Sequence, residues 1–300
     1  MREGYTWLLL AALCVTLSAC SSLTFLVANT PAAFGRYSQL KDLSYANRPR
    51  NKLDVYIPEG LRDKVPVVIF VHGGGWNSGD KAQYKFVGAA LAEQGYVAVL
   101  PNYGLYPHVK SPVFIQDVAR AIVWVHAHAS EWNGDSGRIY LIGHSAGAHI
   151  AVMLALDKEY MQQAGGDAGW LSGVVGLAGP YDFLPFTYPY MNDLFGPPER
   201  FAASQPVNYV RADAPPLLLL QGLQDHTVAP TNTRRLYEMM KSAGGRVHAE
   251  YFEHATHSDL IAAFSFLRNR EPPVMKDIKS FIDANAVTAS AVSGMNRWPR

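Results

Sequence analysis

The sequence predicts an α/β protein in which a mostly parallel central sheet is flanked by helices, with a small irregular cap or insertion. Two observations predict this class. Short aliphatic or β-branched runs alternate with longer segments of helical periodicity along most of the 300 residues, as in βαβ units. Several of the short runs are apolar throughout, which is typical of strands buried on both faces of a parallel sheet. The length fits a single domain.

The individual elements follow from these patterns in chain order. The strand pattern occurs at residues 53–57, 67–71, 97–100, 139–142, 174–178, 217–221 and 250–252. The helix pattern occurs at residues 82–94, 115–129, 146–155, 232–243 and 275–284. Because most strands are separated by a helix, crossover connections are expected to build a doubly wound sheet.

The N-terminus has the pattern of an export signal, which we place at residues 1–19. Arg2 supplies a positive start, and the apolar run 7–17 is too short to cross a bilayer as a stable helix. The run ends in Leu-Ser-Ala-Cys, which resembles the bacterial lipobox, so Cys20 is the expected lipidation site. Secretion with cleavage elsewhere and a cytoplasmic protein with an apolar start are the alternatives.

Three regions are expected after the signal. Residues 20–38 form the lipidated cysteine and a tether, residues 39–285 form the folded domain, and residues 286–300 form a disordered tail. Only two cysteines occur, so cleavage before Cys20 leaves no disulfide framework. Within residues 157–216, an aromatic and proline-rich stretch cannot be helical throughout. It forms either a cap or pocket wall, or a surface excursion whose aromatic side chains fold back onto the domain.

The charge balance excludes one class of partner. The chain has 26 Lys and Arg against 25 Asp and Glu, a formal net charge of +1. A nucleic-acid-binding domain needs a strongly basic surface. We therefore expect no nucleic-acid partner.

A tight turn joins the expected strand 139–142 to a helix. Residues 143–147 read G-H-S-A-G, which is the pattern G-x-S-x-G in a strand–turn–helix context. A nucleophile on such a turn needs neighbours without side chains, because the adjacent backbone passes close by. Gly143 and Gly147 meet that need. Ser145 is therefore the predicted nucleophile, and the alternative is that it only caps the helix.

A glycine-rich segment follows the expected strand 67–71. Residues 72–76 read H-G-G-G-W, which matches the HGGG oxyanion loop. Acyl transfer develops negative charge on the carbonyl oxygen, and preorganised N–H donors stabilise that charge. We expect the N–H groups of Gly73, Gly74 and Ala146 to form this oxyanion hole. A phosphate-binding loop is the alternative, but its glycine spacings are absent.

Serine is a poor nucleophile unless an imidazole takes its proton and a carboxylate orients that imidazole. The acid should follow the expected strand 217–221, where Asp225 lies in a turn before the next helix. Asp225 is the predicted acid. Asp182 and Asp213 are its rivals.

The predicted base is His257, in the loop after the expected strand 250–252. His254 lies nearer to the strand end and is its rival. The two histidines also have a spacing that suits metal binding, but no third ligand lies nearby in the sequence and H-E-x-x-H is absent. We therefore expect no metal and no cofactor.

Aromatic side chains near these motifs belong either to a substrate pocket or to the core, and the sequence favours neither. His144, inside the turn, is expected beside the nucleophile. The candidate pocket residues are Trp76, His144 and Tyr181, together with Tyr103, Tyr106, Phe183 and Phe186.

The segment 72–76, the turn 143–147, Asp225 and His257 together resemble the α/β-hydrolase superfamily, in its branch of HGGG-bearing carboxylesterases and feruloyl or acetylxylan esterase-like enzymes. The resemblance implies the α/β-hydrolase fold and a serine carboxylic-ester hydrolase that acts on a small or aryl ester through an acyl-enzyme. Kynurenine formamidases and prenylcysteine methylesterases share the pattern. An arylformamidase-type amidase is therefore one alternative, and a binding protein without turnover is another.

The chain also resembles bacterial lipoprotein members of that branch, through residues 53–56, 76–79 and 179–185 and through the lipobox. The resemblance implies an exported protein that Cys20 anchors in the cell envelope, with a membrane and a small-molecule ester as its partners. Ser21 after the lipidated cysteine favours the outer membrane for a Gram-negative host.

Overall fold

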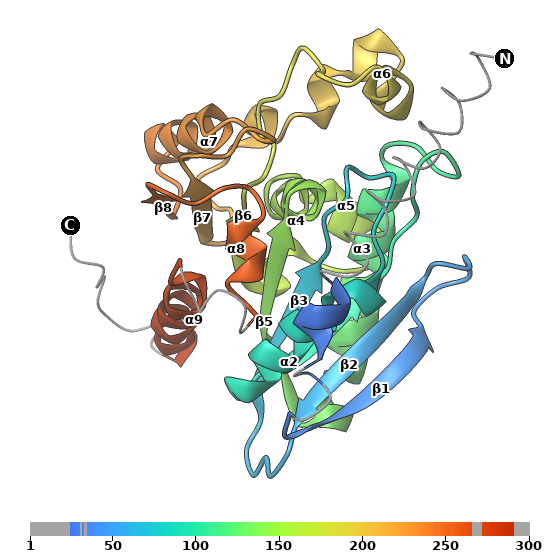
Figure 1. The fold of residues 1–300 in the computed structure, drawn as a ribbon, viewed down its shortest axis with the longest axis vertical. Coiled ribbons are helices and arrows are strands. Elements are labelled where there is room, and N and C mark those ends of the chain that lie inside the picture. Colours follow the sequence, from blue (N-terminus) through green and yellow to red (C-terminus); the bar gives the residue numbers. More distant parts are fainter. Residues whose placement is uncertain (1–24, 31, 33–34, 266–271, 291–300) are drawn as a thin grey trace, which may run out of the picture.

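An eight-stranded sheet crosses the computed structural model, which describes residues 25–30, 32, 35–265 and 272–290 (Figure 1). The strands are β1 Tyr37–Ser44, β2 Lys52–Pro58, β3 Val65–Val71, β4 Val97–Pro101, β5 Gly134–His144, β6 Leu171–Leu177, β7 Leu217–Gly222 and β8 Val247–Phe252. Their order in the sheet is β1-β2-β4-β3-β5-β6-β7-β8. The pairs β1–β2 and β2–β4 are antiparallel, and all pairs from β4 to β8 are parallel. The predicted mostly parallel sheet is confirmed.

Helices cover both faces of this sheet. The α-helices are α2 Lys85–Glu93, α3 Val113–His128, α4 Ala146–Leu156, α5 Glu159–Gln163, α6 Tyr190–Phe195, α7 Thr231–Ser242, α8 Asp259–Ala262 and α9 Val274–Ser290. Short 3-10 turns are η2 Lys81–Tyr84, η3 Ala129–Trp132, η4 Ala168–Trp170, η5 Pro198–Arg200, η6 Ala202–Ser204 and η7 Pro206–Tyr209.

None of the described helices combines the length and apolar character needed to span a membrane.

Two cores form because the side chains of each central strand alternate between the faces. In β3, Val67, Ile69 and Val71 belong to the core under α3 and α4, whereas Val68 and Phe70 belong to the core under α2, α8 and α9. Both faces of the strand are therefore buried. This double burial explains why the sequence of β3 is apolar throughout rather than alternating.

Every predicted strand and helix is present with shifted ends, but β1 was not predicted. It is an edge strand whose residues are all exposed or half-buried, so it lacks an apolar face that a pattern could reveal. It begins at Tyr37, within the segment expected to be a tether. Earlier in that segment, residues 25–29 form a helical turn, and the ring of Phe25 packs 5.3 Å from that of Tyr84.

At the C-terminus, α9 continues to Ser290 and so enters the tail that the sequence predicted to be disordered. The alanines of this stretch favour helix, which agrees with the continuation. Residues 291–300, the predicted signal segment 1–19 and Cys20 lie outside the described residues.

The segment between α4 and β7 carries short helical turns and extends beyond the sheet near α6 and α7 (Figure 1). Its aromatic side chains pack back onto the domain. Phe183 and Phe195 contact Trp76, with ring centroids 5.8 and 5.0 Å apart. The Tyr190 hydroxyl donates a hydrogen bond to the carbonyl of Gly75 at 3.0 Å. The segment therefore packs directly against the loop that follows β3.

Candidate active site

Ser145 occupies the single residue between β5 and α4. Its φ of 56° and ψ of −121° lie in a region that L-amino acids rarely adopt. The close approach of two backbones imposes this turn. A Cβ on Gly143 would lie 2.2 Å from the carbonyl oxygen of Gly147, and one on Gly147 would lie 2.1 Å from that of Val71. The glycines therefore occur where only hydrogen fits, as the motif predicts.

The loop after β3 lies against this turn. A Cβ on Gly73 would lie 3.2 Å from the Cβ of Ser145, so Gly73 is in contact with the predicted nucleophile. Gly74 and Gly75 have φ values of +119° and +57°, which favour glycine. Ala146 begins α4, where backbone N–H groups have no partner within the helix. Two segments that carry the predicted donors thus meet at Ser145.

Asp225 and His257 meet although 32 residues separate them in the chain. Asp225 follows β7, and His257 lies between β8 and α8. The His257 Nδ1 atom lies 2.8 Å from Asp225 Oδ2. Because a carboxylate only accepts, the neutral form of the His257 ring has its proton on Nδ1 and its lone pair on Nε2. Asp225 thereby fixes the tautomer of the His257 ring.

The Asp225 carboxylate is buried and accepts further hydrogen bonds. Its Oδ1 accepts the N–H groups of Thr227 and Val228, both at 2.8 Å, and its Oδ2 accepts the Gln221 side-chain amide at 3.1 Å. Burial raises the pKa of Asp225, but the hydrogen bonds from His257 and from these N–H groups outweigh burial and lower the pKa overall. Asp225 therefore remains ionised at neutral pH.

The rival residues have other partners or exposed positions. Asp182 forms an ion pair with Arg235 at 2.6 Å, and Asp213 forms one with Arg211 at 2.8 Å. His254 is exposed, whereas His257 is half-buried beside its carboxylate. The structure thus brings Asp225 together with His257.

His144 lies directly before Ser145 and packs against His257, with ring centroids 4.8 Å apart. Its Nε2 donates to the His257 carbonyl at 3.1 Å. Burial lowers the pKa of His144 to about 3, so the ring is neutral at physiological pH. A neutral donor at this position fixes the backbone of the His257 loop without adding a positive charge beside the base.

Three of the six other candidate pocket residues are buried in the hydrophobic core. Trp76, Tyr103 and Tyr181 are buried, with relative exposures of 2%, 0% and 0%. Phe183 and Phe186 are partly buried against the same core, as is Tyr106.

Sequence reasoning did not find Gln221 and Tyr190. Gln221 is the one polar side chain in the otherwise apolar strand β7, and this isolated polar residue was the available signal. Its amide nitrogen contacts Asp225 Oδ2, and its amide oxygen accepts the Thr233 hydroxyl at 3.0 Å. Tyr190 contacts Gly75 across 115 residues of chain, and no local pattern marks such a contact.

The parallel sheet, the turn between β5 and α4, and the Asp–His pair after β7 and β8 define an α/β-hydrolase fold of the carboxylesterase-like type. The BD-FAE family model matches residues 53–240. The chain belongs to the BD-FAE family.

Individual known proteins are similar to this chain over most of its length. An isoprenylcysteine alpha-carbonyl methylesterase of Arabidopsis thaliana is 27% identical over 265 residues, which cover 81% of this chain and 62% of that protein. Kynurenine formamidase of Danio rerio is 29% identical over 231 residues, which cover 74% and 75%. The crystal structure of esterase B from Lactobacillus rhamnosis has a TM-score of 0.75 at 20% identity and covers 93% and 96%. The chain therefore spans about three fifths of the methylesterase.

Proposed function

We propose that this protein is a serine carboxylic-ester hydrolase that acts on a small or aryl ester. The observation that carries the proposal is the contact between His257 Nδ1 and Asp225 Oδ2, beside a strained turn that holds Ser145. The glycine loop against Ser145 supports an oxyanion hole at the same place. The methylesterase relative supports the ester class.

The proposed reaction has two steps. His257 Nε2 takes the proton of the Ser145 hydroxyl while its oxygen attacks the ester carbonyl carbon, and Asp225 stabilises the resulting imidazolium. The N–H groups of Gly73, Gly74 and Ala146 bind the oxyanion. His257 then gives its proton to the leaving alcohol, and an acyl-enzyme remains. Water, deprotonated by His257, releases the acid and regenerates Ser145.

A second candidate is an amidase of the arylformamidase type, which the formamidase relative supports. The same residues serve either leaving group, because the reactions differ mainly in how the leaving atom is protonated. Paired substrates separate the two candidates. A preference for a p-nitrophenyl ester supports the esterase, and a preference for a formanilide supports the amidase.

The deciding experiment treats the purified full chain with a fluorophosphonate and locates the adduct by mass spectrometry. Ser145→Ala is the matched control. We expect an adduct on Ser145 and a loss of ester turnover of about 10⁶-fold in the variant. Without an adduct and without turnover, the chain is a binding protein with a hydrolase fold.

We also propose that a lipid on Cys20 anchors the protein in a bacterial cell envelope, at the outer membrane in a Gram-negative host. The sequence before Cys20 and the presence of Ser21 support this. Cells fed labelled palmitate should incorporate the label into the wild type and not into Cys20→Ala. A soluble, unlabelled wild type would contradict the anchor.

A further inference from the structure

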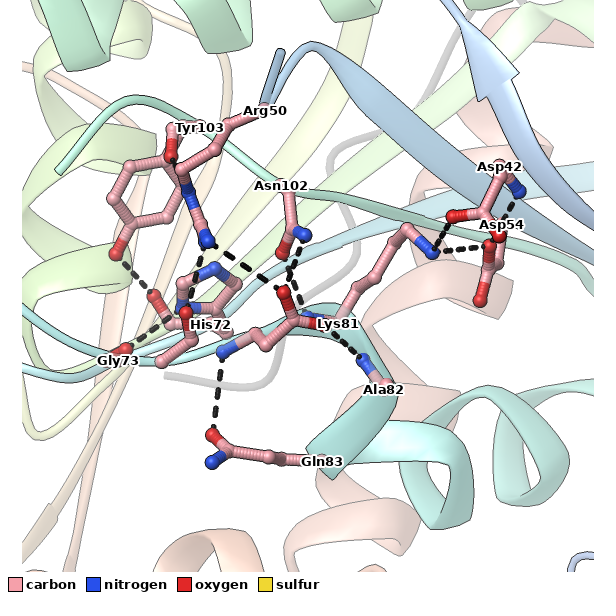
Figure 2. A network of polar contacts seen from close by, with 12 residues as sticks. Asp42, Arg50, Asp54, His72, Gly73, Lys81, Ala82, Gln83, Asn102 and Tyr103 are labelled. Atoms are coloured by element: carbon pink, nitrogen blue, oxygen red, sulfur yellow. Dashed lines mark hydrogen bonds and ion pairs between the residues drawn. The ribbon is translucent and has the colours of Figure 1, made fainter.

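Tyr103 and Arg50 contact the loop that carries the proposed oxyanion donors (Figure 2). Tyr103 follows β4 and is fully buried. Its hydroxyl donates to the carbonyl of His72 at 2.9 Å. Its ring also stacks on the His72 imidazole, with centroids 4.4 Å apart and an interplanar angle of 19°. Tyr103 therefore contacts His72 through both the hydroxyl and the ring.

These contacts act on the donors through peptide planarity. In a trans peptide, the C=O and the following N–H point in opposite directions. The His72 carbonyl shares a peptide with the Gly73 N–H, and Tyr103 fixes that carbonyl. The Gly73 carbonyl shares a peptide with the Gly74 N–H, and it accepts the His72 Nδ1–H at 2.8 Å. Each proposed N–H donor therefore points away from a carbonyl whose direction is fixed by a hydrogen bond, from Tyr103 in one case and from His72 Nδ1 in the other.

Arg50 connects Tyr103 to the end of the same loop. Its Nε donates to the Tyr103 carbonyl at 2.8 Å, and its Nη2 donates to the Gly79 carbonyl at 2.9 Å. A Cβ on Gly79 would lie 2.6 Å from both His72 Nδ1 and the Gly73 oxygen. Gly79 therefore covers the hydrogen bond between His72 and Gly73, and Arg50 holds Gly79 there.

We infer that Tyr103 and Arg50 are positioning residues, which orient the Gly73 and Gly74 N–H groups for the oxyanion before substrate binds. The inference rests on the proposed function. Donors that are oriented in advance need no reorganisation when charge develops, so their effect falls on the chemical step rather than on substrate binding. Neither residue is required to touch substrate.

The test variant is Tyr103→Phe, which removes the hydroxyl and keeps the ring on His72. Tyr140→Phe is the matched control, because Tyr140 is also buried and its hydroxyl also donates to a backbone carbonyl, that of Ile282 at 3.1 Å. We expect Tyr103→Phe to lower kcat for p-nitrophenyl acetate about 10-fold with KM nearly unchanged, a smaller loss than deletion of a whole oxyanion donor. Affinity for a trifluoromethyl ketone, whose adduct carries an oxyanion, should fall by the same factor. Tyr140→Phe should change neither quantity.

Arg50→Lys is the second variant, for use if Tyr103→Phe does not fold. One ammonium cannot replace the guanidinium fork that reaches two carbonyls, so kcat and ketone affinity should again fall together. A kcat within about twofold of the wild type, an equal loss in Tyr140→Phe, or an unchanged ketone affinity would overturn the inference. A wild type without a fluorophosphonate adduct on Ser145 would overturn the proposed function. If the fluorophosphonate labels Ser145 of the wild type but Tyr103→Phe and Arg50→Lys are fully active, only the positioning role is overturned.

Discussion

Replacement of Asp225 by asparagine separates the charge of this residue from its shape. Oδ1 accepts two backbone N–H groups, and an asparagine oxygen can keep both. Oδ2 accepts from Gln221 Nε2 and from His257 Nδ1, and an amide nitrogen there cannot accept. His257 would then move its proton to Nε2. With a proton on Nε2, His257 cannot accept the proton of Ser145, and the base is lost. The loop itself keeps its structure, because the hydrogen bonds to Oδ1 remain.

The size of the effect follows from this tautomer change. An equivalent carboxylate-to-amide change in a serine protease with intact geometry lowers kcat by about 10⁴-fold. At 1.36 kcal/mol for each factor of ten, this is about 5.4 kcal/mol of lost transition-state stabilisation. We expect the full loss of kcat here, because Asp225 is buried and water cannot readily replace the lost acceptor.

The assay is steady-state hydrolysis of p-nitrophenyl acetate, with urea unfolding to show that Asp225→Asn remains folded. The matched controls are Asp182→Asn and Asp213→Asn, whose carboxylates form ion pairs with arginines. Each control should stay within about twofold of the wild type, since pairs of this kind contribute little. The reasoning is refuted if Asp225→Asn keeps more than about a tenth of the wild-type kcat, or if either control loses as much.

Three further predictions concern the base, the buried histidines and the turn. His257→Ala should lower kcat by about 10⁶-fold, whereas the exposed His254→Ala should keep wild-type turnover, and equal losses would contradict the assignment. Burial lowers the pKa of His72, His144 and His149 to about 4, 3 and 4. Since the unfolded chain takes up these protons below about pH 6.5, the free energy of unfolding should fall from pH 6.5 toward 4 by at most about 1.4 kcal/mol per pH unit for each histidine. Urea titrations that show no fall between pH 7 and 5 would contradict this, and His149→Gln should reduce the slope. Gly147→Ala should cost several kcal/mol of stability or prevent folding, because its Cβ would lie 2.1 Å from the Val71 oxygen. Gly165→Ala, whose Cβ meets nothing within 4 Å, should cost only about 1–2 kcal/mol for its positive φ, and similar losses in both variants would contradict the steric argument.

Structural features that depend on residues close together in the sequence, such as the strands and the turn at Ser145, were predictable from the sequence alone. The central strands are buried on both faces, so apolar runs such as that of β3 revealed them. The turn at Ser145 leaves no room for a Cβ at positions 143 and 147, and the glycines at these positions revealed the turn in the sequence. The positions of the expected strands also limited the candidate acids to three aspartates and the candidate bases to two histidines.

Only the tertiary structure decided which distant residues meet. Asp225 contacts His257 because the loops after β7 and β8 converge, and Tyr103 reaches His72 only because β3 and β4 are adjacent in the sheet. Edge strand β1 and the contact of Tyr190 with Gly75 left no local pattern either. Periodicity and turn sterics report the burial and backbone of each segment by itself. Contacts between segments depend on the order and register in which the strands pair. The candidate residues could therefore be predicted from the sequence, but their contact partners were determined by the fold.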